Sequence, residues 1–260
     1  MPLSFSGMKK EFKKNSFTGF HNDVLDEIFA LILFLFSPEK KKVKVPFRGF
    51  LLSGKPACGK TEMIKQVALK AAKHLKDKEI NVKFQLVDAN SIASHKWGEA
   101  EKRLKNIFEG PKAKTKHDKD SIYHTDEKNK LIILFDDIDC LFFDRDSSLS
   151  KEWTYSINQI LFHQLDKLDN SEKIVIATSN KLELLDKALE SRLLDYSIPD
   201  FSQNQLLVIM EKKIPKNLPG RNELISNIKT ALESNPDANV RDLENLINRF
   251  YVKLIKNQQL

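Results

Sequence analysis

Eight consecutive residues in the first quarter of the chain have the spacing of a loop that binds phosphate groups. They match the pattern G-x-x-x-x-G-K-[ST], whose glycines let backbone N–H groups surround the phosphates. The lysine would reach the β- and γ-phosphates, the threonine hydroxyl would hold Mg²⁺, and the start of the next helix would add positive potential. The loop consists of Gly54, Lys55, Pro56, Ala57, Cys58, Gly59, Lys60 and Thr61. The sequence therefore predicts a nucleotide-binding site with a magnesium ligand.

The variable positions of this loop carry unusual side chains. Ala57 would be strained if the backbone there takes a positive φ, which glycine adopts without cost. Cys58 lies in a positive environment near a helix start, which favours a reactive thiol. The alternative for Cys58 is a small residue that simply fits the loop, and both interpretations stay open at this point.

Two adjacent carboxylates close the apolar segment LIILFDD. Acidic groups at the end of a buried strand are costly unless they face a cation or water. We expect Asp136 to orient Mg²⁺ through water and Asp137 to orient the water that attacks the phosphate.

Strand and helix patterns alternate around these groups. Five segments read as strands: FRGFLLSG, NVKFQLVDA, KLIILFDDID, KIVIATSN and DYSIPD. Helical patterns cover Asp23–Phe36, Lys60 to about Leu75, the end of SHKWGEAEKRLKNIFE, and WTYSINQILFHQLDKL. This alternation predicts an α/β fold of the P-loop NTPase type, with a parallel sheet flanked by helices.

The strand patterns stop after Pro199, and only helices are predicted beyond it, at Gln203–Lys213, Arg221–Ser234 and Val240–Lys256. We therefore predict three regions: an N-terminal tail over 1–16, a large α/β domain over 17–200 and a small all-helical lid over 201–260. The polar residues 111–130 lack periodicity and are predicted to be an exposed insert.

The composition narrows the classes of protein that fit. Among the 260 residues, 41 % are hydrophobic and 30 % charged, and the longest apolar run, Ile28–Phe36, is too short to span a bilayer. We recognise no secretory signal or disulfide framework, so we expect an intracellular, cytoplasmic protein without membrane insertion. The net charge of +7 permits a nucleic-acid partner, although the lysines are interleaved with acids as on solvated helix faces.

Taken together, the motifs resemble the AAA+ ATPases, and among them the protein-remodelling AAA branch, from about Phe17 to Phe250. FRGFLLSGKPACGKT and LIILFDDID are similar to the Walker A and Walker B segments. IVIATSN resembles the sensor 1 strand, and LLDKALESRLLDYSIPD the second region of homology. NVRDLENLINRF is similar to a sensor 2 helix, and SHKWGEAEKRLKNIF to the first pore loop.

The resemblance implies further roles at the matching positions. ATP and Mg²⁺ would be the ligands, and Asn180 would position the hydrolytic water. Arg192 stands at the arginine-finger position, from which it would reach a neighbouring subunit's γ-phosphate, and Arg241 would reach the nucleotide from the lid. Lys96 and Trp97 would grip a threaded polypeptide. The implied assembly is a ring of six identical or related AAA+ subunits that acts on a protein substrate, with an adaptor as a further partner.

Two departures from the family pattern bear on function. Asp137 stands where the family has glutamate, so its carboxylate is one methylene shorter and hydrolysis could be slow. The pore loop reads KWGE, without the residue that usually separates the aromatic side chain from the glycine. The leading hypothesis is an ATP-driven protein remodeller; the alternatives are a nucleic-acid-associated loader or initiator and a non-hydrolysing, nucleotide-gated scaffold.

Overall fold

The computed structural model describes residues 2–12, 20–37, 43, 45–93, 98–109, 125–142 and 148–257, with the backbone alone at Ala93 and 148–153. A parallel sheet with the strand order β2-β3-β4-β1-β5 forms its centre. The strands are β1 (Gly49–Ser53), β2 (Asn81–Asp88), β3 (Asn129–Asp136), β4 (Lys173–Ser179) and β5 (Leu193–Ser197). All five match predicted strands, so the predicted α/β class is confirmed.

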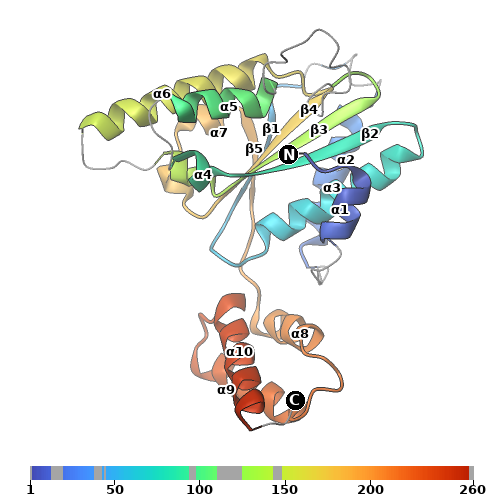
Figure 1. The fold of residues 1–260 in the computed structure, drawn as a ribbon, viewed down its shortest axis with the longest axis vertical. Coiled ribbons are helices and arrows are strands. Elements are labelled where there is room, and N and C mark those ends of the chain that lie inside the picture. Colours follow the sequence, from blue (N-terminus) through green and yellow to red (C-terminus); the bar gives the residue numbers. More distant parts are fainter. Residues whose placement is uncertain are drawn as a thin grey trace.

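Helices cover both faces of the sheet (Figure 1). One face carries α1 (Phe5–Phe12), α2 (Asn22–Leu35) and α3 (Lys60–Lys76). The other face carries α4 (Ala89–Ala93), α5 (Glu99–Glu109), α6 (Ser148–Lys167) and α7 (Lys187–Glu190). Short 3₁₀ turns follow β3 at Ile138–Leu141 and β4 at Leu182–Leu184.

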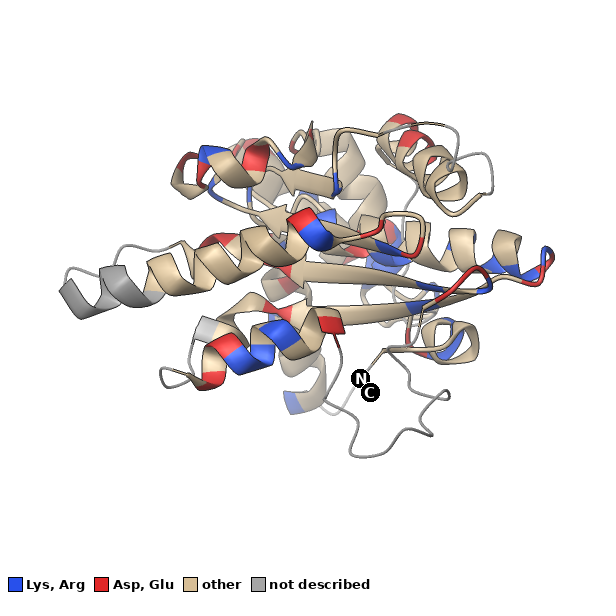
Figure 2. Cartoon of the chain, turned by 90° about the horizontal axis from the view of Figure 1, so that it is seen from above, with Lys and Arg blue, Asp and Glu red and all other residues tan. Residues whose placement is uncertain are grey.

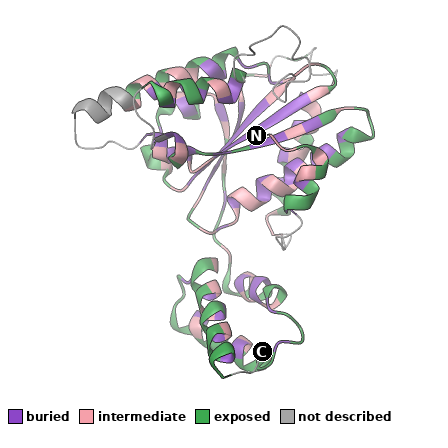
Figure 3. Ribbon diagram, in the orientation of Figure 1, coloured by how far each residue is buried: buried purple, intermediate pink, exposed green. Residues whose placement is uncertain are grey.

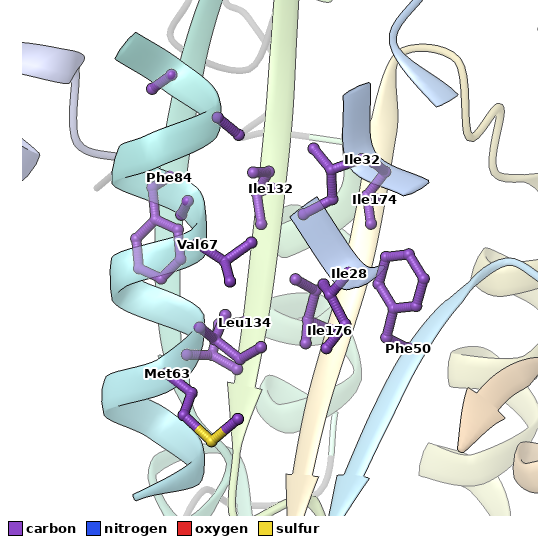
Figure 4. Packing of buried hydrophobic residues seen from close by; sticks show 14 of the residues in the cluster. Ile28, Ile32, Phe50, Met63, Val67, Phe84, Ile132, Leu134, Ile174 and Ile176 are labelled. Carbon is purple, nitrogen blue, oxygen red and sulfur yellow. The ribbon is translucent and has the colours of Figure 1, made fainter. Parts of the chain in front are cut away.

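The three inner strands are almost entirely buried because helices cover both of their faces, and their middle residues are apolar, as in other parallel sheets. Figure 3 shows these strands as the most continuously buried part of the chain. Figure 4 shows Met63 and Val67 of α3 facing Ile132 and Leu134 of the sheet, with Ile28 of α2 beside them. Charged residues lie mainly on the outer helices and connecting loops (Figure 2).

The N-terminal residues differ from the predicted tail. Phe5–Phe12 forms α1, and Leu3 pairs with Phe84 on the edge strand β2 in an antiparallel bridge. Met8 and Phe12 are buried in the same core as α2 and α3. The Phe12 and Phe84 rings pack edge to face, with their centroids 5.3 Å apart. This segment is therefore part of the sheet's covering layer, although residues 13–19 lie outside the described part of the chain.

Three C-terminal helices group below the sheet in Figure 1 around a separate cluster of buried residues. They are α8 (Gln203–Lys213), α9 (Arg221–Ser234) and α10 (Val240–Lys256), with the predicted bounds. Ser202 and Asn239 cap α8 and α10 in capping boxes, which explains why these two starts are readable in the sequence. The exact division into a large domain and a lid at residue 200 stays a prediction.

Two other predictions, the exposed insert and the lack of a membrane-spanning segment, can be compared with the structure only over the described residues. β3 already begins at Asn129, so the last two residues of the predicted 111–130 insert belong to the sheet, and 110–124 lie outside the described residues. None of the helices over the described residues combines the length and apolar composition that a membrane crossing requires.

Candidate functional site

The predicted phosphate loop connects β1 to α3 at the carboxyl edge of the sheet. A Cβ on Gly54 would come within 2.5 Å of the Ile198 carbonyl oxygen, and Gly59 has a φ of +94°. Ala57 also adopts a positive φ, 67°, in the region where an L-residue costs about 1–2 kcal/mol. The strain anticipated at Ala57 is therefore present in the folded loop.

Lys60 is buried, and its ammonium group is satisfied by oxygen atoms of the loop and of β4's end. Nζ donates to the carbonyl oxygens of Gly54 and Lys55 at 2.7 and 2.9 Å and to Asn180 Oδ1 at 2.8 Å. Only 5 % of the residue is exposed, so a charge is held inside the loop. Phosphate oxygens could take the place of these acceptors without leaving the buried ammonium unpaired.

Cys58 lies in the same loop but is 2 % exposed. Its Sγ accepts a hydrogen bond from Lys60 Nζ at 3.6 Å, and it packs within the core cluster on the α3 side of the sheet. This burial favours the interpretation of Cys58 as a small residue that fits the loop.

Thr61 and Asp136 meet at the start of α3 and the end of β3. Thr61 Oγ1 donates to Asp136 Oδ1 at 2.6 Å. A hydroxyl and a carboxylate oxygen are hard ligands of the kind that Mg²⁺ prefers, and Mg²⁺ commonly takes few protein ligands beside water and substrate phosphates. The pair therefore fits the predicted ion.

Asp137 turns out of the strand in a left-handed conformation, with φ 53° and ψ 52°. Its Oδ1 accepts a hydrogen bond from Asn180 Nδ2 at 2.6 Å. Burial raises the pKa of the Asp137 carboxyl, and the carboxylates of Asp136 and Asp139 raise it further, against the Asn180 amide and the Lys60 charge. Asp137 is thus a carboxylate whose environment favours taking up a proton.

Asn180 links the lysine to this acid, because its amide accepts from Lys60 and donates to Asp137. Its own backbone N–H donates to Asp139 Oδ1 at 3.1 Å, which fixes the turn after β4. The structure therefore brings together Lys60, Thr61, Asp136, Asp137 and Asn180, which the sequence places on three separate segments.

Thr178 was not predicted as a site residue, yet it contacts both acids. Its Oγ1 donates to Asp136 Oδ1 at 2.7 Å and accepts from the Asp137 backbone N–H at 3.0 Å. Asp139 was also missed. The only available signal for Thr178 was the change from apolar to polar residues at the end of IVIATSN, and for Asp139 it was the third acid of LIILFDDID.

Arg192 lies apart from these groups, just before β5. Its Nε and Nη2 donate to the two carboxylate oxygens of Asp166 on α6, each at 2.8 Å, and Nη1 donates to the Ala188 carbonyl oxygen at 2.7 Å. The guanidinium also lies 5.1 Å from the centre of the Phe162 ring. Arg192 holds the pKa of Asp166 below its usual range. The side chain thus forms a partly exposed ion pair within the chain.

A cavity of about 170 Å³ lies between the phosphate loop and the C-terminal helices. Loop residues 55–58 line one wall and residues 236–240 line another, with Phe201 between them. Arg241 follows directly at the start of α10 as an exposed residue, and its backbone N–H donates to Asn239 Oδ1. Arg241 is therefore next to the cavity in the chain but is not one of the residues that line it.

The predicted substrate-gripping residues Lys96 and Trp97 lie outside the described residues. The helix predicted at the end of this segment is present as α5 and begins at Glu99, and the Gly98 N–H donates to Glu101 Oε2 at 2.6 Å.

The sequence profile of the ATPase family associated with various cellular activities (AAA) matches residues 50–198. The chain is 27 % identical over 237 residues to an ATP-dependent zinc metalloprotease FtsH of Lancefieldella parvula, covering 87 % of this chain and 32 % of the relative. It is 29 % identical over 149 residues to a proteasome-associated ATPase of Thermobifida fusca, covering 55 % and 24 %. The chain thus spans a third or less of the length of these relatives.

Two solved structures share the fold. Caenorhabditis elegans PCH-2 aligns with a TM-score of 0.63 at 17 % identity, over 97 % of this chain and 68 % of that one. A chain of the E. coli MS115-1 HORMA:CdnC:Trip13 complex aligns with a TM-score of 0.59 at 14 % identity, over 92 % and 91 %. At these identities the likeness concerns the fold alone.

Proposed function

The chain belongs to the AAA family of ATPases, and from this premise we propose that it binds and hydrolyses ATP to remodel protein substrates in an oligomeric ring. The observation that carries the proposal is the joint placement of a phosphate-loop lysine, a threonine–carboxylate pair and a second, amide-bonded carboxylate at one edge of the sheet. We call this group the acid corner. It consists of Lys60, Thr61, Asp136, Asp137, Thr178 and Asn180.

Five of the six residues of the acid corner have a distinct part in the proposed reaction. Lys60 binds the β- and γ-phosphates, and Thr61 and Asp136 hold Mg²⁺, which would neutralise charge on the phosphates. Asp137 accepts a proton from a water molecule while the water oxygen bonds to the γ-phosphorus and the bond to the β–γ bridging oxygen breaks. The raised pKa of Asp137 supports this proton-accepting part. Asn180 orients the same water.

Arg192 would complete the site from a neighbouring subunit. An arginine that meets the transferring phosphate stabilises the charge of the transition state and typically adds about 10³ to 10⁵ in rate. Arg192 now pairs with Asp166, so it would exchange this carboxylate for the neighbour's phosphate on assembly. A ring of six identical or related subunits is the proposed assembly.

The C-terminal helices would act as the lid over the nucleotide. The cavity between them and the phosphate loop supports a nucleotide bound at this junction. Arg241, at the start of α10, would couple the position of the lid to the state of the phosphates.

The proposed substrate is an unfolded polypeptide that Lys96 and Trp97 grip in the pore, with an adaptor as a further partner. The relatives support this choice of substrate, since one is named a protease and the other is named as proteasome-associated. Asp137 in place of the family's glutamate would slow each cycle without preventing nucleotide binding.

The test is steady-state ATP hydrolysis with and without an unfolded protein, for the wild type and for Trp97→Ala. We expect the unfolded protein to raise the rate in the wild type and not in Trp97→Ala, with basal hydrolysis retained in both. Stimulation by DNA or RNA, with steep salt dependence of binding, would instead identify a nucleic-acid-associated loader. Tight ATP binding with no turnover in the wild type, and turnover only in Asp137→Glu, would identify a nucleotide-gated scaffold.

A further inference from the structure

Thr178 is the one residue of the acid corner that has no part in the proposed reaction. It lies near the end of β4 and is fully buried. The sheet register pairs Leu52 of β1 with Thr178 and Phe135 of β3 with Ala177. Thr178 therefore lies beside the end of β3, where the two acids Asp136 and Asp137 follow Phe135. A buried hydroxyl at this point needs hydrogen-bond partners.

Both kinds of hydrogen bond that a hydroxyl can make are directed at those acids. The single O–H donates to the Asp136 carboxylate at 2.7 Å, and the oxygen accepts the backbone N–H of Asp137 at 3.0 Å. Because a threonine hydroxyl has only one proton, the donor and acceptor directions are fixed by these two partners.

The first bond orients the carboxylate that faces the predicted ion. Asp136 Oδ1 accepts from Thr61 at 2.6 Å as well as from Thr178. Two donors from different elements, α3 and β4, hold this oxygen, so the carboxylate has little freedom to rotate. The loss of one donor would release it.

The second bond holds the turn that aims Asp137. The backbone of Asp137 is left-handed, a conformation that asparagine and aspartate tolerate better than most residues. The Thr178 hydroxyl holds the N–H of this residue, and the Asn180 amide holds its carboxylate. The position of the Asp137 carboxylate depends strongly on its backbone, since aspartate has one methylene fewer than glutamate with which to reach a water molecule.

We propose that Thr178 is a positioning residue that sets both acids with one hydroxyl, a proposal that rests on the ATP hydrolysis proposed above. It acts through Asp136 on the binding of Mg²⁺ with nucleotide and through Asp137 on the chemical step. A purely structural buried hydroxyl would affect stability alone.

The experiment compares Thr178→Val, which keeps the shape and removes the hydroxyl, with Thr178→Ser, which keeps the hydroxyl. Ser53→Ala is the matched control, because Ser53 is buried on the neighbouring strand and its hydroxyl donates to Asp195, away from the acids. The measurements are kcat and KM for ATP, the thermal midpoint, and the affinity for a non-hydrolysable ATP analogue with Mg²⁺ or with EDTA.

We expect Thr178→Val to lower kcat by about 10- to 100-fold, as small misplacements of catalytic groups do, with a much smaller change in KM. The gain in analogue affinity on adding Mg²⁺ should shrink in the same variant. Thr178→Ser should restore both quantities to near wild type, and Ser53→Ala should leave both unchanged. Thr178→Cys, a weak hydrogen-bonding substitute of similar size, should resemble the valine variant and replaces it if valine prevents folding.

A valine or cysteine variant with wild-type kcat and a wild-type Mg²⁺-dependent gain, changed only in its thermal midpoint, would overturn the proposal. If the wild type itself does not hydrolyse ATP, the proposed function fails, but the Mg²⁺-dependent gain still decides the role of Thr178. An unchanged gain in that case would also overturn it.

Discussion

The acid corner and the surroundings of Arg192 contrast in how their charges are satisfied. In the acid corner, a buried lysine and two carboxylates are joined by short hydrogen bonds that start from α3, β3 and β4. At Arg192 the charge is balanced by one carboxylate on α6, with the arginine side chain 26 % and the aspartate side chain 52 % exposed. Both regions lie in the same α/β unit, yet only one is enclosed by it.

This difference indicates which parts of the proposed site one subunit can complete. Buried charges that lose a partner are costly, so the acid corner is expected to keep its arrangement in every subunit. A partly exposed ion pair is worth less than a buried one, on the order of 1 kcal/mol, so a change of its partner costs less than breaking up the acid corner. Arg192 therefore has the energetics of a group that can change partners on assembly, and the acid corner has those of a fixed frame.

Arg192→Ala is the variant with the largest expected effect, and it tests whether the arginine completes a neighbouring subunit's site. We expect the rate per subunit in the wild type to rise with protein concentration and to fall by about 10³-fold or more in the variant. The reason is that transition-state charge would lose its counter-charge while nucleotide binding in the acid corner persists. Steady-state hydrolysis over a range of protein concentrations, with analogue binding measured in parallel, checks both parts.

A mixing experiment provides the control for Arg192→Ala. Lys60→Ala subunits should fail to bind ATP but retain Arg192, while Arg192→Ala subunits bind ATP but lack the arginine. Activity that returns on mixing two inactive variants requires Arg192 to act on a neighbour. No recovery, although the two variants assemble together, would contradict an action between subunits.

Asp137→Asn tests whether the carboxylate of Asp137 in the acid corner acts as the proton acceptor. The amide has nearly the same shape but cannot accept a proton, so we expect kcat to fall by about 10²- to 10⁴-fold, the usual contribution of general acid–base catalysis. The affinity for the ATP analogue should change little, because Lys60 and Asp136 remain. Asp26→Asn, in an exposed ion pair with Lys70, is the matched charge control. Unchanged turnover in Asp137→Asn would exclude Asp137 as the base.

The pH dependence tests the same carboxylate without removing it. Only the ionised form of Asp137 can accept the proton, so its raised pKa places the acidic limb of kcat/KM at a higher pH than an ordinary aspartate would give. Asn180→Ala removes a hydrogen bond that lowers this pKa, so the limb should move further up in pH as kcat falls. A rate profile over pH for both proteins, with stability checked at each pH, measures the shift. A limb that stays in place would mean that another group controls it.

Much of the fold was readable from the sequence because its signals are local. The apolar strands, the end of β1 at the phosphate loop and the capped helices α8 and α10 follow from neighbouring residues. The packing of α1 could not be predicted from the sequence, since Phe12 contacts Phe84, which is far from it in the chain. A short amphipathic segment with a distant partner has no local pattern that distinguishes it from a tail.

The site residues also divide into those that local motifs predict and those whose roles depend on contacts between distant segments. Lys60, Thr61 and Asp136 follow from the motifs at the strand ends, and their proximity is seen in the fold. Thr178 was missed because a threonine in a strand is an ordinary choice there, and its role depends on the register between β3 and β4. The pairing of Arg192 with Asp166 was missed because it joins α6 to the start of β5 through tertiary packing.

The smallest expected effect comes from Asp166→Asn, which weakens the contact that holds Arg192 in its own subunit. A partly exposed pair of this kind is worth on the order of 1 kcal/mol, so we expect a small drop in thermal midpoint and a rate at limiting protein concentration that rises by no more than about 5-fold. The rise follows because Arg192 has less to give up when it turns to a neighbour's phosphate. Hydrolysis and assembly across protein concentration measure it, with Asp26→Asn as an exposed pair elsewhere. A fall in rate would mean instead that Asp166 holds Arg192 in the position from which it acts, and that the two regions form one frame.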